Sequence, residues 1–477
     1  MSFTKDARDI IDQLSVYLHQ SRSKEKRAVN LQTIRHIQEH LGLEQYLCDG
    51  GLSGETLNRF VETYLGFTTR LHHPGFMAHQ VGVPHPTGAL ASLIDGFTNN
   101  AMAIYEMGPA ASAIEFFLIN TLLTKIGWVP MPDDITQRLE TDHGAGVLTH
   151  GGSLANLTAL LAARNQLAPE AREGGTPGNL VILAPESSHY IISKSAGIIG
   201  VGEKNVVPLP TDDLGRIITE KLDAIYEKIR SQGKQVVALV ANACATGTGL
   251  YDDLNAIGTF CSDRRIWFHI DGAHGACALF SKKMRPLLHG VEKADSIVLD
   301  AHKMLRTPLL CAALLLKNAR PLDCNFEHTA SYLFHDKLQP GFDFIGQTIE
   351  CTKAGLGLKF YFTLAALGEK GISQYLEQTQ ALTLNAHEFI SKAPDFDCPY
   401  VPQSNILCFR ITGSDDLQLE IRDRLMALGH YHISSTMLKD RRYLRIVIIS
   451  PDTRFEDIEQ LIQEVRKLAH TAENKEI

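Results

Sequence analysis

The stretch that decides the fold, residues 267–306, reads WFHIDGAHGACALFSKKMRPLLHGVEKADSIVLDAHKMLR. Two short apolar runs, Arg265 to Ile270 and Ser296 to Leu299, predict buried strands. Polar groups follow both runs: Asp271 comes directly after the first, and Lys303 comes shortly after the second. Because ligands bind at the carboxyl ends of strands in an open parallel sheet, these two side chains mark a candidate site.

The pairing of an acid with a lysine suits one cofactor in particular. Asp271 and Lys303 stand 32 positions apart (303 minus 271) and follow what we expect to be adjacent strands. In a pyridoxal phosphate site, a lysine amine forms a Schiff base and a carboxylate keeps the pyridine nitrogen protonated. A desolvated lysine also has a lowered pKa and becomes a nucleophile. The ordinary alternatives are a helix-capping aspartate and a solvated lysine.

The totals describe a soluble globular chain. It has 477 residues, 44% hydrophobic and 21% charged, which predicts two or more domains. A net charge of −8 without a long basic run argues against a nucleic-acid-binding protein. Nine scattered cysteines without a CxxC pair indicate a reducing compartment. There is no apolar leader or membrane-length apolar run, so we expect a cytoplasmic protein.

The pattern of apolar residues predicts three parts. Residues 1–70 show helical spacing and form an arm that we expect to pack on another domain or subunit. Residues 71–370 contain a long helical segment at 88–126 and then alternating strands and helices, which indicate a parallel sheet with covering helices. Residues 371–477 predict a smaller α+β domain.

A candidate phosphate cradle follows the strand GVLT, where the chain reads HGGSLANLTALLAARN. Gly151 and Gly152 let the backbone come close to a ligand, and Ser153 can cap the helix. Free backbone N–H groups and the helix dipole then favour a phosphate. The alternative is an ordinary capped helix after a strand.

Three further residues are weaker candidates. His189 follows the strand LVILAP and could stack on a pyridine ring, although a lone histidine is often structural. Thr246 follows the strand VVALVANA, where its hydroxyl could bond a ring substituent or only backbone. Arg445 lies inside the apolar run YLRIVII, where it could bind a carboxylate or lie on an edge strand with its head in water.

Metal catalysis is the less favoured reading of the histidine-rich segment. His72, His73, His79 and His85 lie close together, but in a proline-rich loop without an HxxxH helix or acids at ligand spacing. We therefore predict no metal site.

The order of motifs resembles the group II pyridoxal-phosphate-dependent amino-acid decarboxylases, the family that acts on glutamate, cysteine sulfinate, diaminobutyrate and aromatic amino acids. The resemblance covers roughly residues 70 to 450. It implies a fold type I, transferase-like α/β architecture, with a mainly parallel seven-stranded sheet in the large domain. The motifs are HPGF (73–76), YEMGPAASAIE (105–115), GGSLAN (151–156), ATGTGLYDDL (245–254), HIDGAHG (269–275), DAHKML (300–305), ASYL (330–333), QTIECTKAGLGLKFY (347–361) and YLRIVIISP (443–451).

The resemblance implies a role for each ring-contacting residue. Lys303 would be the Schiff-base lysine and Asp271 the partner of the pyridinium nitrogen. Ala273 would pack on one face of the ring, and His189 would stack on the other.

The phosphate and the ring hydroxyl have counterparts too. Ser153, with the neighbouring backbone at Gly152, and His302 would hold the phosphate. Thr246 matches the threonine near the ring hydroxyl.

Substrate binding and assembly complete the implied site. Arg445 matches the arginine that clasps the substrate α-carboxylate, and Tyr332 the mobile-loop tyrosine that returns a proton after CO2 leaves. The resemblance also implies a homodimer with active sites at the subunit interface, where the arm and the loop at 319–346 would contribute.

The sequence departs from the family pattern at three places. The usual Gly-Thr-Thr is Cys244-Ala245-Thr246, the tryptophan after the ring-contacting alanine is His274, and the usual Asn-Pro-His-Lys is Asp300-Ala301-His302-Lys303. The expected activity is decarboxylation of an L-amino acid to its amine. The alternatives are another pyridoxal lyase or aldehyde synthase on the same fold, or a non-catalytic homologue acting as a binding partner.

Overall fold

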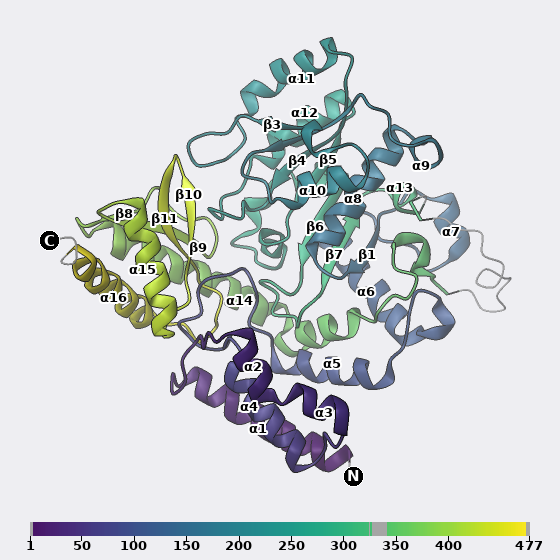
Figure 1. The fold of residues 1–477 in the computed structure, drawn as a ribbon. Helices are drawn as coiled ribbons and strands as arrows, with labels where there is room; N and C mark the ends of the chain where they lie inside the picture. The colour runs from purple at the N-terminus through teal and green to yellow at the C-terminus, as the bar shows by residue number, and fades with distance from the viewer. Residues whose placement is uncertain (1–2, 324, 327–340, 474–477) are drawn as a thin grey trace. The chain divides into compact units, whose positions relative to one another are not determined.

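The computed structural model describes residues 3–323, 325–326 and 341–473. The chain falls into two compact units (Figure 1). The first unit comprises residues 1–79, 381–401 and 405–477, and the second comprises residues 80–380 and 402–404. The predicted three-part organisation, with boundaries after residues 70 and 370, remains a prediction.

The second unit is built on a seven-stranded sheet with the order β1-β7-β6-β5-β4-β2-β3. Its pairings leave six strands parallel to one another, and β7 runs antiparallel to both of its neighbours. The prediction of a mainly parallel seven-stranded sheet is confirmed. The strands are β1 (Ala145–Thr149), β2 (Leu180–Pro185), β3 (Val206–Leu209), β4 (Gln235–Asn242), β5 (Trp267–Asp271), β6 (Ser296–Asp300) and β7 (Ala312–Leu316).

Two physical reasons account for this sheet. Helices cover it (Figure 1), so the central strands are buried on both faces and read as continuous apolar runs. The direction of β7 follows from chain length. A parallel return needs a crossover of a dozen or more residues, whereas only residues 301–311 join β6 to β7.

The helices of this unit begin and end largely where the apolar spacing predicts. The α-helices are α5 (Pro86–Thr98), α6 (Pro109–Ile126), α7 (Ile135–Glu140), α8 (Gly152–Leu167), α9 (Ala171–Gly174), α10 (Ile191–Ile198), α11 (Leu222–Ser231), α12 (Leu254–Arg264) and α13 (Arg320–Asp323). The 3-10 helices are η1 (Tyr105–Met107), η2 (Glu203–Asn205), η3 (Thr219–Lys221), η4 (Gly275–Phe280), η5 (Arg285–Leu288), η6 (Val291–Lys293) and η7 (Phe344–Gln347).

The prediction of one helical segment over 88–126 is wrong. Asn99 adopts a left-handed conformation (φ 50°) and ends α5, and Pro109 starts α6. Between them Ala101 forms a bridge with Ala354, a pairing from a distant part of the chain.

The first unit combines four N-terminal helices with a small antiparallel sheet of order β10-β11-β9-β8. The long helix α14 begins in the second unit and ends in the first, with a break at Gly368 (φ 64°). The elements are α1 (Phe3–Arg22), α2 (Ile34–Leu41), α3 (Leu43–Asp49), α4 (Glu55–Phe67), α14 (Gly357–Ser391), β8 (Phe396–Asp397), β9 (Ile406–Ile411), α15 (Asp415–Leu428), β10 (Ser434–Leu438), β11 (Arg441–Val447) and α16 (Phe455–Glu473).

Two general features follow from the described residues. No helix among them is both long enough and apolar enough to cross a bilayer. The eight described cysteines are all free thiols, and five of them are buried.

Candidate active site

The turn after β6 carries the lysine singled out in the sequence. Asp300 ends the strand, and its backbone N–H donates to the Ala273 carbonyl at 3.1 Å. Lys303 Nζ lies 3.2 Å from Asp300 Oδ2, with its side chain 21% exposed. The amine is therefore held by a carboxylate, yet solvent can still reach it.

Asp271 ends the neighbouring strand β5, where it is buried. Its Oδ1 accepts a hydrogen bond from the Ala273 N–H at 3.2 Å. His189 lies close to these groups. Burial lowers the pKa of His189, Asp271 opposes this shift, and the Lys303 charge adds to it. Ile191 N–H donates to His189 Nδ1 at 3.3 Å, which leaves Nε2 as the protonated nitrogen of the neutral ring. The structure thus brings together the acid, the amine and the imidazole.

The candidate phosphate cradle lies at the start of α8. Gly151, with φ 97°, occupies the N-cap position without a side-chain capping bond. The prediction that Ser153 caps this helix is therefore wrong; Ser153 is exposed in the first turn. A Cβ on Gly152 would come within 2.6 Å of Asp300 Oδ1, so only glycine fits there. The first turn keeps backbone N–H groups for a ligand.

His302 lies buried beside this cradle. Its Nδ1 is 2.8 Å from the Cys311 carbonyl, and its Nε2 is 3.6 Å from Asp300 Oδ2. Burial lowers the pKa of His302, and Asp300 partly offsets that shift. A Cβ on Gly151 would lie 3.9 Å from His302 Cε1, which places the ring next to the start of α8.

A chain of hydrogen bonds that sequence reasoning missed supports the cradle. Trp267 Nε1–H donates to Ser296 Oγ, which lies 2.8 Å from His269 Nδ1. His269 Nε2 is 2.8 Å from Asn156 Oδ1, and the Asn156 amide donates to the Gly152 carbonyl at 2.9 Å. Burial lowers the pKa of His269 to about 4, so the ring is neutral at physiological pH. The available signal was a histidine inside an apolar strand.

The structure describes two of the three remaining predicted residues. Thr246 is exposed on the loop after β4. Tyr332 lies outside the described residues. Arg445 belongs to the first unit.

Arg445 is an interior residue of its sheet. Its strand β11 pairs with β10 on one side and β9 on the other, and the residue is buried. Nη1 donates to the Ala78 carbonyl at 3.1 Å and to Ser434 Oγ at 3.2 Å. The alternative of an edge-strand arginine with its head in water is therefore wrong. The pKa of nearby His79 is lowered by burial and by the Arg445 charge.

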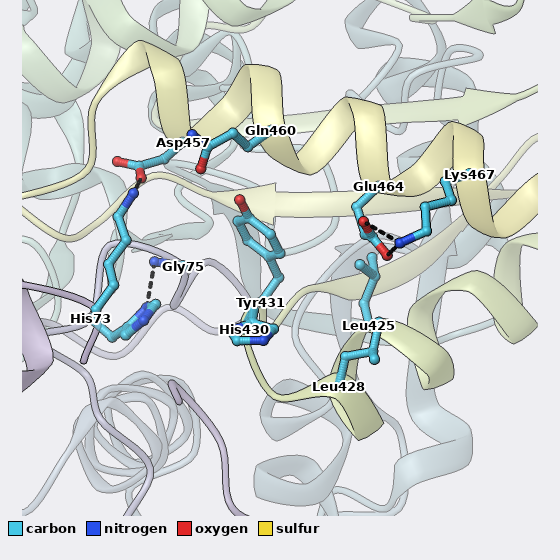
Figure 2. A pocket seen from close by; sticks show the side chains of 11 residues that line it. His73, Gly75, Leu425, Leu428, His430, Tyr431, Asp457, Gln460, Glu464 and Lys467 are labelled. Atoms are coloured by element: carbon cyan, nitrogen blue, oxygen red, sulfur yellow. Dashed lines mark hydrogen bonds and ion pairs between the residues drawn. The ribbon is translucent and has the colours of Figure 1, made fainter. Parts of the chain in front are cut away.

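The first unit also contains a separate cavity of about 400 Å³ beside α16 (Figure 2). It holds part of the HPGF motif: Gly75 N–H donates to His73 Nδ1 at 2.9 Å. A Cβ on Gly75 would come within 2.2 Å of the His430 carbonyl, so the motif makes a tight turn here. None of the predicted site residues lines the cavity, which is formed by Lys24, His73, Gly75, Leu425, Leu428, His430, Tyr431, Asp457, Gln460, Glu464 and Lys467.

Comparison with known proteins decides the family. Residues 59–412 match the family described as the pyridoxal-dependent decarboxylase conserved domain. The chain belongs to this family. It is therefore a pyridoxal 5′-phosphate-dependent amino-acid decarboxylase, as the motifs predict.

Relatives of several substrate classes resemble this decarboxylase. An acidic amino acid decarboxylase of Xenopus tropicalis is 27% identical over 448 residues, covering 89% of this chain and 85% of the relative. An aromatic-L-amino-acid decarboxylase of Bacillus atrophaeus is 27% identical, covering 84% and 82%. An L-2,4-diaminobutyrate decarboxylase of Acinetobacter baumannii is 26% identical, covering 86% and 83%.

Solved structures share the decarboxylase's fold. Mouse CSAD in its apo form has a TM-score of 0.88 at 24% sequence identity, with 98% of each chain covered. The Oryza sativa TDC complex with PLP and tryptamine has a TM-score of 0.87 at 20% identity, again with 98% of each chain covered. The predicted fold type I architecture is confirmed.

The residues of the second unit fit the cofactor. A lysine amine and a carboxylate follow adjacent parallel strands, and a helix N-terminus made of two glycines lies beside them. Asp300 Oδ1 is buried against Gly152 without a hydrogen-bond partner among the described residues, as expected of a group that faces a ligand position.

Proposed function

We propose that the decarboxylase works through the cluster at the carboxyl ends of β5 and β6, with Lys303 as the residue that carries the cofactor. The observation behind the proposal is the Lys303 amine 3.2 Å from Asp300 Oδ2, partly exposed, near the Asp271 carboxylate and the Gly151–Gly152 turn. Once bound, pyridoxal phosphate supplies the electron sink for the electron pair of the breaking Cα–carboxylate bond.

Side chains of the protein bind the ring and the phosphate of the cofactor. Asp271 would place its carboxylate next to the ring nitrogen, and a carboxylate there favours the protonated nitrogen. His189 and Ala273 cover the two faces of the ring. His302 and the α8 N-terminus, including Gly152 and Ser153, hold the phosphate, and Thr246 bonds the ring hydroxyl.

Substrate handling involves two residues beyond this cluster. Arg445 binds the α-carboxylate, because a buried guanidinium with a planar fork suits that group. Tyr332, which lies outside the described residues, returns a proton to Cα after CO2 leaves. Both roles rest on the motif resemblance.

We also propose a cytoplasmic homodimer with active sites at its interface and the helical arm packed on the partner subunit. The support is exposed apolar surface, which a monomer rarely keeps. On α5, Leu90, Leu93, Ile94 and Phe97 are all exposed, Phe97 to 70%. Sedimentation of the purified protein tests the dimer; a monomer at micromolar concentration would contradict it.

A substrate panel tests the activity. Purified holoenzyme is incubated with acidic, basic and aromatic L-amino acids, and CO2, amine and aldehyde are measured. We expect CO2 with one amine product, together with a visible absorbance band of the lysine–cofactor adduct that Lys303→Ala abolishes. An aldehyde product would favour the aldehyde synthase alternative. The absorbance band without any CO2 would overturn the decarboxylation proposal.

A further inference from the structure

Asp300 has an unusual environment for a carboxyl group. It is 4% exposed, and its Oδ2 faces Lys303 Nζ at 3.2 Å and His302 Nε2 at 3.6 Å. Its Oδ1 is buried and has no hydrogen-bond partner among the described residues. That oxygen lies against Gly152, where a Cβ would approach it to 2.6 Å.

This arrangement puts a carboxyl group at the position proposed for the phosphate cradle. A buried oxygen without a partner costs about 1–3 kcal/mol. The 16-residue helix α8 offsets part of that cost, because its N-terminus favours a negative charge nearby. Asp300 is thus the acidic side chain at this helix end.

A bound phosphate would bring a second acidic group next to this carboxyl group. At neutral pH a phosphate monoester carries a charge close to −2. Two anions in contact raise the pKa of one of them, as in paired carboxylates. An ionised carboxylate can only accept hydrogen bonds, whereas a protonated carboxyl group can donate one. The family pattern has asparagine at this position, whose amide donates without titrating.

We propose that Asp300 takes up a proton from solvent when the cofactor phosphate enters, and that the resulting Oδ1–H donates to a phosphate oxygen. Cofactor affinity would then be linked to pH through a residue in the cradle. The proposal rests on the proposed function for the place of the phosphate.

Other titratable groups near Asp300 could take up the proton in its place when the phosphate binds. Lys303 and His302 face Asp300 from its own turn, and His189 senses its charge from the loop after β2. Cys311, which directly precedes β7, also interacts electrostatically with Asp300, but burial raises the pKa of its thiol to about 12. His302 is therefore the rival acceptor to be tested.

The experiment compares pyridoxal phosphate with pyridoxal, which shares the ring and lysine chemistry but lacks the phosphate. Apoenzyme is titrated with each between about pH 7 and about pH 8.5, above the second phosphate pKa. The measured quantity is the affinity for pyridoxal phosphate divided by the affinity for pyridoxal. In the wild type this ratio should fall as pH rises, by up to about tenfold per pH unit for one proton. In Asp300→Asn the ratio should stay constant and exceed the wild-type ratio at high pH.

The outcomes separate the two proposals. A wild-type ratio that is independent of pH would overturn the proton uptake. So would a slope that persists in Asp300→Asn but disappears in His302→Asn, because the proton would then belong to His302. Failure of the wild type to form the absorbing adduct with either compound would instead overturn the proposed function. Thermal unfolding of each apoenzyme variant checks that it is folded.

Discussion

Two lysine–carboxylate pairs in the second unit differ in one instructive respect. Lys353 Nζ and Glu115 Oε2 lie 2.7 Å apart, and both side chains are 0% exposed. The other oxygen of Glu115 accepts the Leu148 N–H at 2.7 Å, so each carboxylate oxygen has a partner. In the pair of Lys303 and Asp300, the amine is partly exposed and one oxygen has no partner among the described residues.

The difference shows how a lysine–carboxylate pair can either stabilise the fold or take part in a reaction. We call the pair of Lys353 and Glu115 the saturated pair, because both carboxylate oxygens have partners. This buried pair connects three segments: helix α6, strand β1 and the segment that contains Lys353. Burial raises the pKa of Glu115, and the Lys353 charge opposes that shift. The pair of Lys303 and Asp300, which we call the open pair, leaves an amine and a carboxyl oxygen that a bound ligand can contact.

Removing the amine of the open pair should have the largest effect. Lys303→Ala should lower CO2 release by at least about 10³-fold, the scale on which enzymes lose activity without their covalent nucleophile. The absorbance band of the cofactor adduct should disappear. The urea unfolding midpoint of the apoenzyme should fall less than in Lys353→Met, because His302 Nε2 still lies 3.6 Å from Asp300 Oδ2. Retained decarboxylation would show that another lysine carries the cofactor.

Removing the amine of the saturated pair should instead damage the fold. Lys353→Met leaves Glu115 buried without its partner, which should cost about 3–5 kcal/mol in the free energy of unfolding. Urea unfolding of the apoenzyme measures this loss.

The exposed pair of Lys392 and Glu388 provides the matched control, because its side chains are 72% and 67% exposed. Lys392→Met should change stability by no more than about 1 kcal/mol. Equal losses in the two variants would contradict the distinction between saturated and exposed pairs.

The buried histidine of β5 should make stability depend on pH. Burial lowers the pKa of His269 from 6.5 to about 4, so the unfolded chain binds more protons than the folded chain between these values. The free energy of unfolding should therefore fall as the pH drops from about 6.5 to about 4, by at most about 3 kcal/mol from this residue. His269→Gln should flatten that part of the profile; an unchanged profile would show that other groups cause it.

The smallest effect is expected at Arg445. Arg445→Lys keeps the charge but loses the planar fork, so kcat/KM should fall by about 10- to 100-fold, mainly through KM. Arg442→Lys, on the same strand, is the control and should leave both constants near the wild-type values. A change confined to stability in Arg445→Lys would favour a purely structural arginine.

The central sheet could be predicted from the sequence because strands buried on both faces carry unbroken apolar runs. Features that depend on contacts with distant parts of the chain could not be predicted. Asn99 ends a helix where Ala101 meets Ala354, and the short strand β10 exists through its pairing with β11. Asp300 was visible as a departure from the family motif, but its unpartnered oxygen depends on the approach of α8.

The eleven-residue connection between β6 and β7 gives the lysine turn a fixed length. Both strands pair residue for residue, Ser296 opposite Leu316 and Asp300 opposite Ala312. Strand β7 also pairs residue for residue with β1 on its other side, so slipping β7 by one position would shift its register against both neighbours at once. Residues within this turn can therefore vary in chemistry much more readily than the turn can gain or lose a residue.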